Sequence, residues 1–445
     1  GIGGIGMSAL ARYFNNIGWQ VAGYDRTSTS LTDALIKEGI PVYFEDKIEL
    51  IPEFITAGNK MHIVVVFTPA VPAEHKQKNY FLQHGFETMK RSEVLGELAA
   101  EGTCIAVAGT HGKTTTTTLI AHILYSNQYP CNAFLGGIST NYNTNLLLDS
   151  NAACNVVEAD EFDRSFLRLF PTLAVVTSMD ADHLDIYGNE ESVHKSYNEF
   201  VQQVKSNGKV IYKLGLPLKV NVSSFTYSLS DNAADYTVSE ISIKNGEYYY
   251  TIHYPGGKIN NVKSGLPGRH NVENALAAFA AAHQLGIEIS GITNAISTYQ
   301  GVKRRFEYII KNNNLVYIDD YAHHPAELTA CISSVKEMYP GKNITGIFQP
   351  HLFTRTRDFA MEFAKSLELL DRIILLDIYP ARELPIDGVT ANMLLKQIKN
   401  ENKIVSTKEA LIPELKKNRP QVLLTLGAGD IDKLVEPIKK GLLQA

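Results

Sequence analysis

A glycine loop that ends in a lysine is the stretch of this sequence best equipped for chemistry. Residues 105–108 are small and apolar, and the loop after them contains Gly109, Thr110, His111, Gly112, Lys113, Thr114 and Thr115. Backbone N–H groups at a helix start bind anions, a lysine here reaches terminal phosphates, and the Thr114 hydroxyl suits Mg²⁺. Val107 stands where the full phosphate-loop pattern has its first glycine, and the alternative is an ordinary turn with a solvated lysine. We predict a loop that binds a nucleoside triphosphate.

Acidic residues follow another apolar run of the same segment. Residues 154–157 lead directly into Glu158, Asp160, Glu161 and Asp163. Four carboxylates so close together repel one another unless a cation or basic groups offset their charge. Open parallel sheets bind ligands at the carboxyl ends of their strands, and carboxylates are ligands that Mg²⁺ prefers. We predict that Glu158 binds the metal; the alternative is a solvated acidic turn.

A histidine lies among aspartates after the next apolar run. Residues 173–177 precede Asp180, Asp182, His183 and Asp185. A single histidine is more often structural, but this one follows a strand of the sheet that carries the phosphate loop. We predict that His183 binds a second Mg²⁺ or the substrate.

The chain opens on a second glycine-rich loop. Gly1, Gly3 and Gly6 fit the pattern G-x-G-x-x-G, and Gly4 and Ser8 leave room for the backbone to approach a diphosphate. Such a loop normally follows a buried strand, so we expect that a few residues, the initiator Met included, precede it. We predict a site for a nucleotide diphosphate; the alternative is a dinucleotide site.

Two predicted strand ends complete this first site. Residues 20–24 end at Asp25, an acidic residue about twenty positions after the loop that could bind ribose hydroxyls. Residues 63–67 lead to Thr68, which we expect in the same crevice. We interpret residues 1–100 as a small Rossmann-like domain.

The elements that must position the phosphate loop occupy residues 101–309. We expect a mostly parallel sheet, a flexible turn at residues 136–139 and an antiparallel meander over residues 236–262 at the sheet edge. A helix that opens after Gly268 places Asn271 and Asn274 on one face of its first turn. Helix capping explains one of these asparagines but not both.

A third domain is predicted over residues 310–445. Each of four apolar runs is followed by a helical pattern: 315–318, 344–348, 373–376 and 422–426. Arg355 and Arg357 follow the second run and could grip a carboxylate or a phosphate, the alternative being a surface arginine pair. The predicted fold class is therefore α/β, with a Rossmann-like N-terminal domain, a central domain of the phosphate-loop ATPase type and a Rossmann-like C-terminal domain.

Composition excludes several other classes of protein. The 445 residues exceed a single core, and a net charge of −5 gives no reason to expect nucleic acid as a partner. Four cysteines without metal-like spacing indicate a reducing compartment. No apolar run approaches the roughly 20 residues of a membrane span, and no signal segment is visible. We expect a cytoplasmic protein without a membrane span, either a monomer or a homodimer.

Seven motifs, in this order along the chain, carry a family resemblance. They are residues 1–8 (Gly-Ile-Gly-Gly-Ile-Gly-Met-Ser), 109–115 (Gly-Thr-His-Gly-Lys-Thr-Thr), 158–161 (Glu-Ala-Asp-Glu), 180–185 (Asp-Ala-Asp-His-Leu-Asp), 270–275 (His-Asn-Val-Glu-Asn-Ala), 319–325 (Asp-Asp-Tyr-Ala-His-His-Pro) and 354–358 (Thr-Arg-Thr-Arg-Asp). Together they closely resemble the Mur ligase family over essentially the whole chain.

The resemblance implies an ATP- and Mg²⁺-dependent enzyme of peptidoglycan precursor synthesis. Its expected reaction joins L-alanine to the carboxylate of UDP-N-acetylmuramic acid through an acyl phosphate, giving ADP and phosphate. It implies a UDP-substrate-binding domain (1–100), a central ATP-binding ligase domain (101–309) and a C-terminal domain for the amino acid and part of ATP (310–445). A muropeptide ligase of the same family, which adds a tripeptide, is the nearest alternative. A nicotinamide-dependent oxidoreductase or a silent nucleotide-binding scaffold would leave the second glycine loop or the intact Lys113 unexplained.

The resemblance also implies roles for individual residues. Lys113 and the rest of the loop 109–115 would bind ATP phosphates, with metal ligands Thr114, Glu158 and His183. Further ATP contacts would come from Asn271, Asn274, Arg305 and Asp320. The amino acid and the reacting phosphate would be surrounded by Tyr321, His323, Arg355 and Arg357, with His323 a candidate base. The UDP substrate would be lined by Gly1, Gly3, Gly4, Gly6, Met7, Ser8, Asp25 and Thr68.

Overall fold

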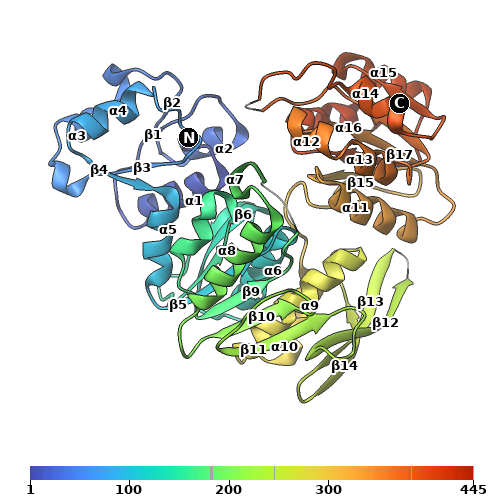
Figure 1. The fold of residues 1–445 in the computed structure, drawn as a ribbon, viewed down its shortest axis with the longest axis horizontal. Helices are drawn as coiled ribbons and strands as arrows, with labels where there is room; N and C mark the ends of the chain where they lie inside the picture. Colours follow the sequence, from blue (N-terminus) through green and yellow to red (C-terminus); the bar gives the residue numbers. More distant parts are fainter. Residues whose placement is uncertain (181–183, 245, 382, 444–445) are drawn as a thin grey trace. The chain divides into compact units, whose positions relative to one another are not determined.

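The computed structural model of the chain describes residues 1–180, 184–244, 246–381 and 383–443 (Figure 1). It divides into two compact units. The first contains Gly1–Ser239, Thr251–Val262 and Glu273–Tyr299, and the second contains Glu240–Tyr250, Lys263–Val272 and Gln300–Ala445.

The first hundred residues alternate short strands with helices. Their two sheets each have two parallel strands, β1 with β2 and β3 with β4. The elements are α1 (Ile5–Asn16), β1 (Gly23–Tyr24), α2 (Ser30–Lys37), β2 (Val42–Tyr43), η1 (Ile48–Leu50), α3 (Glu53–Thr56), η2 (Lys60–His62), β3 (Val64–Phe67), α4 (Lys76–Gln83), β4 (Glu87–Lys90) and α5 (Arg91–Ala100). The predicted strand 20–24 is thus only two residues long, because pairing with β2 begins at Gly23.

A ten-stranded sheet forms the centre of the chain. Its order is β14-β13-β12-β11-β10-β9-β5-β8-β6-β7. The strands are β5 (Thr103–Ala108), β6 (Asn132–Ser139), β7 (Thr144–Leu147), β8 (Cys154–Glu158), β9 (Leu173–Val176), β10 (Lys209–Lys213), β11 (Ser223–Ser228), β12 (Tyr236–Lys244), β13 (Glu247–Tyr254) and β14 (Gly257–Lys263). From β6 to β12 the neighbours are parallel, and β7 is antiparallel to β6.

Helical segments lie between these strands or follow the last of them. They are α6 (Lys113–Ser126), η3 (Phe162–Arg168), α7 (Leu184–Tyr187), α8 (Glu190–Gln202), α9 (Arg269–Gln284) and α10 (Ile289–Thr298). Of these, η3, α7 and α8 contribute residues to one buried cluster with the sheet. The strands β5 and β9 are almost wholly buried, which explains their continuous apolar runs. Ala9 and Leu10 of α1 belong to the same buried cluster as Phe134 of β6 and Leu146 of β7.

The prediction of a flexible turn at residues 136–139 was wrong. These residues complete β6, which runs from Asn132 to Ser139. Two adjacent glycines are typical of a turn, but Gly136 is required here for a close approach. A Cβ atom at Gly136 would lie 2.1 Å from a carboxylate oxygen of Glu158 on β8. Glycine within a strand marks such an approach of a neighbouring group.

The C-terminal part of the chain is built on a six-stranded sheet. Its order is β15-β16-β20-β17-β18-β19, parallel except for the antiparallel edge strand β15. The strands are β15 (Glu307–Lys311), β16 (Val316–Asp320), β17 (Ile344–Phe348), β18 (Arg372–Leu375), β19 (Lys403–Val405) and β20 (Val422–Leu426). The helices are α11 (Pro325–Met338), α12 (Phe353–Asp358), α13 (Ala360–Leu367), α14 (Ala391–Gln397), α15 (Lys408–Lys417), η4 (Asp430–Leu434) and α16 (Val435–Leu443). Four predicted strands are present, while β15 and β19 were not predicted.

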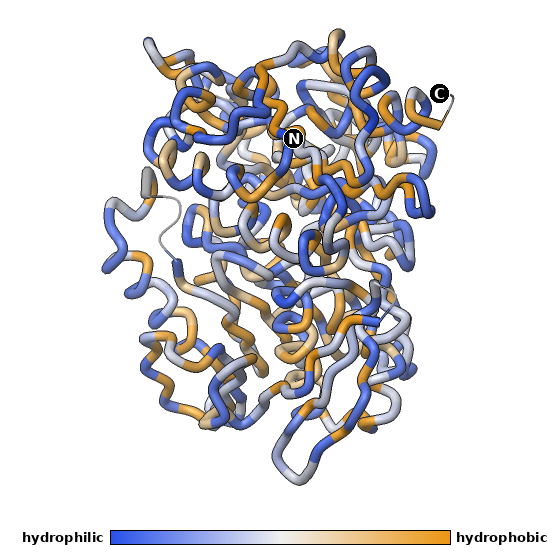
Figure 2. Tube along the Cα trace, turned by 90° about the vertical axis from the view of Figure 1, so that its right-hand side faces the viewer, coloured by the Kyte–Doolittle hydropathy of each residue, from blue (hydrophilic) through white to orange (hydrophobic). Residues whose placement is uncertain are grey.

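Hydrophobic residues recur in short stretches along the whole trace, separated by hydrophilic ones (Figure 2). Within the described residues, no helix combines the length and the apolar character needed to cross a membrane.

Candidate functional site

The phosphate loop lies where its sequence predicts, between β5 and α6. In the sheet, β5 is flanked by β8 and β9, so the loop lies beside the carboxyl ends of both neighbours. Gly112 has a left-handed φ of +82°, and Gly109 has a φ of +138°. A Cβ atom at Gly109 would lie 2.0 Å from the hydroxyl of Thr177, and one at Gly112 would lie 2.5 Å from the amide oxygen of Asn274. Neither position has space for a side chain.

Residues after β9 hold the loop by hydrogen bonds. The backbone N–H of His111 donates to the hydroxyl of Ser178 at 2.8 Å, and the hydroxyl of Thr177 donates to the carbonyl of His111. The hydroxyl of Thr110 donates to the carbonyl of Asp180 at 2.8 Å. The loop is therefore held in one conformation, with the start of α6 presenting backbone N–H groups, as an anion site requires.

Lys113, the first residue of α6, is turned back toward the loop and the acidic strand end. Its ammonium group donates to the carbonyl of Gly109 at 2.7 Å and lies 2.9 and 2.7 Å from the two carboxylate oxygens of Glu161. Burial alone lowers the pKa of this lysine, but the carboxylates of Glu161, Asp160 and Glu158 raise it above its ordinary value. Lys113 is therefore charged. Sequence reasoning gave no role to Glu161, and its position in a dense acidic motif was the only available signal.

Basic residues offset the acidic turn, as its charge density requires. Arg91 lies 3.8 Å from Asp160, and Lys90 lies 3.2 Å from Asp163. Both basic residues come from the junction of β4 and α5 in the first hundred residues. The guanidinium of Arg91 also lies against the first glycine loop, since a Cβ atom at Gly6 would be 3.0 Å from its Nη1. Arg91 was not predicted, because nothing in its local sequence points to either loop.

The described residues contain no group of three or more acidic, histidine or cysteine side chains arranged to hold a metal. His183, predicted as a metal ligand, lies outside the described residues. Glu158 ends β8 with its carboxylate against Gly136, in a space that any side chain at Gly136 would fill. This carboxylate and the hydroxyl of Thr114 at the start of α6 are oxygen donors of the kind that Mg²⁺ takes.

The two asparagines that were predicted to contact ATP differ in their surroundings. Asn274 lies at the phosphate loop, where its amide oxygen faces Gly112 and lies 3.4 Å from the hydroxyl of Thr116. Asn271 is buried and donates to the carbonyl of Pro267 at 2.7 Å, a local bond at the start of α9. Its side chain is used within its own turn.

The first glycine loop is bound to its own domain at several points. The backbone N–H of Gly3 donates to Asp25 at 2.7 Å, and a Cβ atom at Gly3 would lie 2.9 Å from that carboxylate. Thr68 lies 3.9 Å from a Cβ atom placed at Gly1, so the two predicted strand ends do meet the loop. Met7 and Ser8 are buried. The hydroxyl of Ser8 donates to the carbonyl of Ile5 at 3.0 Å and accepts from the amide of Asn145 at 2.9 Å, and its predicted contact with the substrate stays a prediction.

In the second unit, an aromatic ring lies between two arginines. Arg304 and Arg305 lie 5.1 and 4.9 Å from the ring centre of Tyr321. Asp320 is buried and accepts hydrogen bonds from the backbone N–H groups of Phe306 at 2.8 Å and Ala322 at 2.7 Å. Burial raises the pKa of Asp320 to about 6, although Arg305 and these bonds act in the opposite direction.

His323 is held by the start of α11. Its Nδ1 lies 3.0 Å from the carbonyl of Tyr321 and 3.4 Å from Glu327. Glu327 also accepts from the backbone N–H of His323 at 3.0 Å and lies 3.8 Å from Arg305. Burial lowers the pKa of His323 to about 4, with Glu327 acting against this shift. The imidazole is therefore neutral at pH 7. Glu327 was not predicted; it lies in the first turn of α11, where an acidic residue after the N-cap His324 was the available signal.

The predicted arginine pair lies on α12. Arg357 is exposed and lies 2.7 Å from Asp358, its neighbour in the sequence. Arg355 is partly buried and contributes to the charge around His323. The structure thus places Arg355 near His323, whereas Arg357 forms an exposed ion pair with Asp358.

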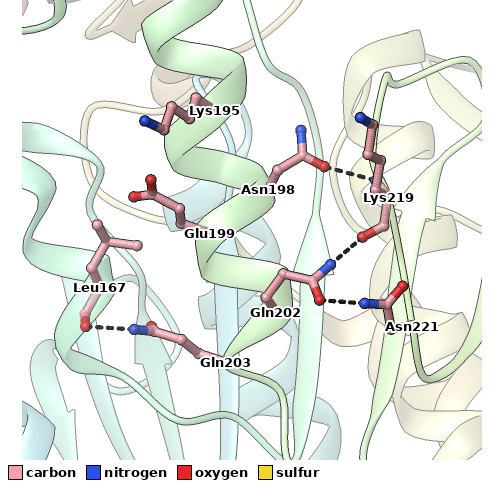
Figure 3. A pocket seen from close by; sticks show the side chains of 8 residues that line it. All are labelled: Leu167, Lys195, Asn198, Glu199, Gln202, Gln203, Lys219 and Asn221. Carbon is pink, nitrogen blue, oxygen red and sulfur yellow. Dashed lines mark hydrogen bonds between the residues drawn. The ribbon is translucent and has the colours of Figure 1, made fainter.

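A separate surface pocket lies beside α8 (Figure 3). It contains none of the predicted site residues. Its lining consists of Leu167, Lys195, Asn198, Glu199, Gln202, Gln203, Lys219 and Asn221. Four amide side chains of this set form hydrogen bonds within the protein, for example Gln202 to the carbonyl of Lys219 and Gln203 to that of Leu167. These amides fasten neighbouring segments to α8.

Comparison with known proteins gives matches along the whole chain. Residues 1–103 match a domain described as Mur ligase family, catalytic domain; residues 107–282 match the Mur ligase middle domain; and residues 304–429 match the Mur ligase, glutamate ligase domain. A protein of Porphyromonas gingivalis named UDP-N-acetylmuramate–L-alanine ligase is 51% identical over 448 residues, which cover 99% of this chain and 98% of that protein.

Solved structures give the same picture. The crystal structure of a UDP-N-acetylmuramate-alanine ligase of Thermotoga maritima matches with a TM-score of 0.84 and 27% identity, covering 100% of this chain and 98% of that one. A murein peptide ligase of Psychrobacter arcticus matches with a TM-score of 0.73 and 24% identity, covering 99% and 97%. At 24% identity, the match to the Psychrobacter arcticus protein shows only that the two chains share a fold.

Proposed function

The chain belongs to the Mur ligase family, and from this premise we propose that it joins L-alanine to the carboxylate of UDP-N-acetylmuramic acid, with cleavage of ATP to ADP and phosphate. This reaction is a step of peptidoglycan precursor synthesis. The observation that carries the proposal is the 51% identity, over almost the full length of both chains, to a relative that bears the name of this activity. The phosphate loop with its partly buried, charged Lys113 is the kind of site that such chemistry needs.

Carboxylates must be activated before an amine can attack them, because an oxide ion is too poor a leaving group. In the proposed first step, a carboxylate oxygen of the sugar substrate attacks the γ-phosphorus of ATP, and ADP leaves. In the second, the alanine nitrogen attacks the carbonyl carbon of the acyl phosphate, and phosphate leaves with the former carboxylate oxygen. Lys113 and the N–H groups at the start of α6 would bind and neutralise the phosphates during transfer.

Mg²⁺, when bound, would supply further charge neutralisation on the transferred phosphoryl group. Thr114 and Glu158 are the described residues that fit this ion, and we propose His183 as a third ligand. Asn274 would contact the nucleotide where it now contacts the glycine loop. We propose the same ATP site for Asn271, Arg305 and Asp320.

The amine must lose a proton before it attacks. His323 is neutral at pH 7 and can accept that proton at Nε2, since Nδ1 faces the carbonyl of Tyr321 and Glu327. We propose that Tyr321, Arg355 and Arg357 bind the alanine and the reacting phosphate. Residues 310–445 would then form the amino-acid domain, 101–309 the ATP domain and 1–100 the UDP-substrate domain.

The test is phosphate release with ATP, Mg²⁺ and UDP-N-acetylmuramate, in which L-alanine is compared with the tripeptide L-Ala-γ-D-Glu-meso-diaminopimelate. We expect release that depends on L-alanine and on the UDP substrate. Substrate labelled with ¹⁸O in its carboxylate should pass one labelled oxygen to the released phosphate. Release with the tripeptide alone would assign the protein to muropeptide recycling, and release with neither amine would refute the proposed ligase activity.

A further inference from the structure

One asparagine of the central sheet forms all its side-chain hydrogen bonds with residues of α1. Asn145 lies on β7, is 0% exposed, and its amide nitrogen donates to the carbonyl of Ile5 at 2.6 Å and to the hydroxyl of Ser8 at 2.9 Å. Its amide oxygen accepts a hydrogen bond from the guanidinium of Arg12, one helical turn further along. Both donor hydrogens and the oxygen are therefore used, and every partner belongs to α1.

These bonds reach the helix at its N-terminal end, directly after the first glycine loop. Ile5 and Ser8 follow Gly1, Gly3 and Gly4, and the hydroxyl of Ser8 in turn donates to the carbonyl of Ile5 at 3.0 Å. The backbone N–H of Ser8 donates to the carbonyl of Gly4 at 2.8 Å, which joins the loop to the helix. The orientation of the loop thus depends on the turn that Asn145 binds.

Arg12 extends the same arrangement to the end of α2. Its Nε and Nη2 lie 2.7 Å from the two carboxylate oxygens of Glu38, in a two-point ion pair. Because a planar guanidinium with three fixed hydrogen bonds has few alternative positions, Arg12 resists rotation of α1 about its own axis.

We propose that Asn145 is a positioning residue for the UDP substrate: through the first turn of α1, it holds the diphosphate-binding glycine loop of the first domain in place from the central sheet. The inference rests on the proposed function, since it assumes that this loop binds a UDP-linked substrate. Asn145 itself touches the helix and not the ligand, so its loss should affect substrate binding and leave the ATP site unchanged.

A matched control is available in the same sheet. Asn155 on β8 is also buried, and its amide nitrogen donates to two backbone carbonyls of another element, Leu98 at 3.1 Å and Glu101 at 2.9 Å at the end of α5. It resembles Asn145 in residue type, burial and number of donated bonds, but it binds the C-terminal end of α5 rather than the first turn of α1. Replacement by leucine keeps the branched shape and the number of side-chain heavy atoms, and it removes the hydrogen bonds in both cases.

The experiment measures UDP-N-acetylmuramate binding by calorimetry without ATP, together with the KM of each substrate, for the full-length wild type, Asn145→Leu, Asn145→Ser and Asn155→Leu. We expect the Asn145 variants to bind the UDP substrate about tenfold more weakly, the effect of unsatisfied buried groups on a binding loop. Their KM for ATP should stay within about twofold of wild type, since no bond of Asn145 reaches the phosphate loop. Asn155→Leu should lose thermal stability to a similar extent and bind both substrates normally.

Hydrogen exchange gives a second measurement. The backbone amides of residues 3–8 should exchange faster in Asn145→Leu and at the wild-type rate in Asn155→Leu. The inference is overturned if the Asn145 variants bind the UDP substrate as wild type does, if Asn155→Leu weakens that binding equally, or if only the Asn145 variants fail to fold. A wild-type protein that neither binds UDP-N-acetylmuramate nor releases phosphate in its presence would refute the proposed function itself.

Discussion

The ammonium group of Lys113 lies 2.7 Å from one carboxylate oxygen of Glu161 and 2.9 Å from the other; the Lys113 side chain is 13% exposed and that of Glu161 is 4% exposed. A lysine that is expected to bind phosphate therefore already has an anionic partner inside the protein. Terminal phosphates must share or displace this carboxylate when ATP binds. The pair also explains how the chain tolerates a dense acidic motif beside its phosphate loop.

Removing one member of this pair should cost more than removing both. Lys113→Met leaves a buried carboxylate without its cation, and we expect a loss of about 3 kcal/mol in the free energy of unfolding together with loss of phosphate release. The double variant Lys113→Met/Glu161→Gln should regain most of the stability and none of the activity. Urea unfolding and phosphate release measure the two effects.

The control for this prediction is the partly exposed ion pair between Lys213 and Glu273, which are 3.0 Å apart. Lys213→Met should cost less than about 1 kcal/mol, because exposed pairs contribute little. Equal losses for the two lysine variants would contradict a special role of burial at Lys113.

Gly112→Ala should abolish productive ATP use. The alanine would be strained at a φ of +82°, and its Cβ atom would lie 2.5 Å from the amide oxygen of Asn274. Gly188 has a similar φ of +78° but open space around it, so Gly188→Ala should cost only about 1 kcal/mol of stability. We expect kcat/KM for ATP to fall at least about a hundredfold in the first variant, the effect of displacing a positioned group. Similar kinetics in both variants would show that strain alone matters.

Gly136→Ala should change the metal dependence of the reaction. Its Cβ atom would lie 2.1 Å from a carboxylate oxygen of Glu158, so this carboxylate must move. We expect the Mg²⁺ concentration for half-maximal phosphate release to rise about tenfold or more, since misplaced groups at a metal site typically cost that much. A titration with Mg²⁺ at saturating ATP tests this prediction. An unchanged midpoint with a reduced kcat would show that Glu158 is not a ligand of the metal.

Two titratable groups of the second unit, His323 and Asp320, should give opposite pH dependences of stability. The pKa of His323 is lowered to about 4, so the unfolded chain binds more protons than the native one between its ordinary value of 6.5 and 4. This histidine therefore lowers the free energy of unfolding as the pH falls through that range, by up to about 3 kcal/mol. His323→Gln should remove this loss.

Asp320 acts in the other direction. Its pKa is raised from 3.8 to about 6, so the native state binds more protons in that window, and this group raises the free energy of unfolding as the pH falls. Asp320→Asn should therefore make the protein relatively less stable near pH 4.5 than near pH 7, when each value is compared with wild type. Urea midpoints at these two pH values test both signs, and changes of the same sign in the two variants would contradict the assignment.

Much of the fold could be predicted because its strands are buried on both faces and its loops carry glycine at fixed places. The run 105–108, its lysine and the helix after it follow directly from such local patterns. The extent of strands was less predictable, as β1 and β6 show. Gly136 lies within a strand because the carboxylate of Glu158 on β8 leaves no space for a side chain there. Glu158 is distant in the sequence, so no local pattern around Gly136 contains that information.

The same limit explains the residues that sequence reasoning missed. Glu161, Arg91 and Asn145 each act across a long separation in sequence, and each has an ordinary local context. Their importance comes from which buried group they face. Both glycine loops lie directly before a helix, as predicted. The roles of the individual site residues stay predictions that the variants above can test.

The shared buried cluster of α1, β6 and β7 has a consequence for the order of synthesis. Residues 1–100 leave the ribosome before Phe134 and Leu146, which cover Ala9 and Leu10 of α1 in the finished protein. Domains usually fold as they emerge, but this one lacks the apolar surface that covers one side of its first helix. We therefore expect Ala9 and Leu10 to stay exposed to solvent until β6 and β7 have been translated.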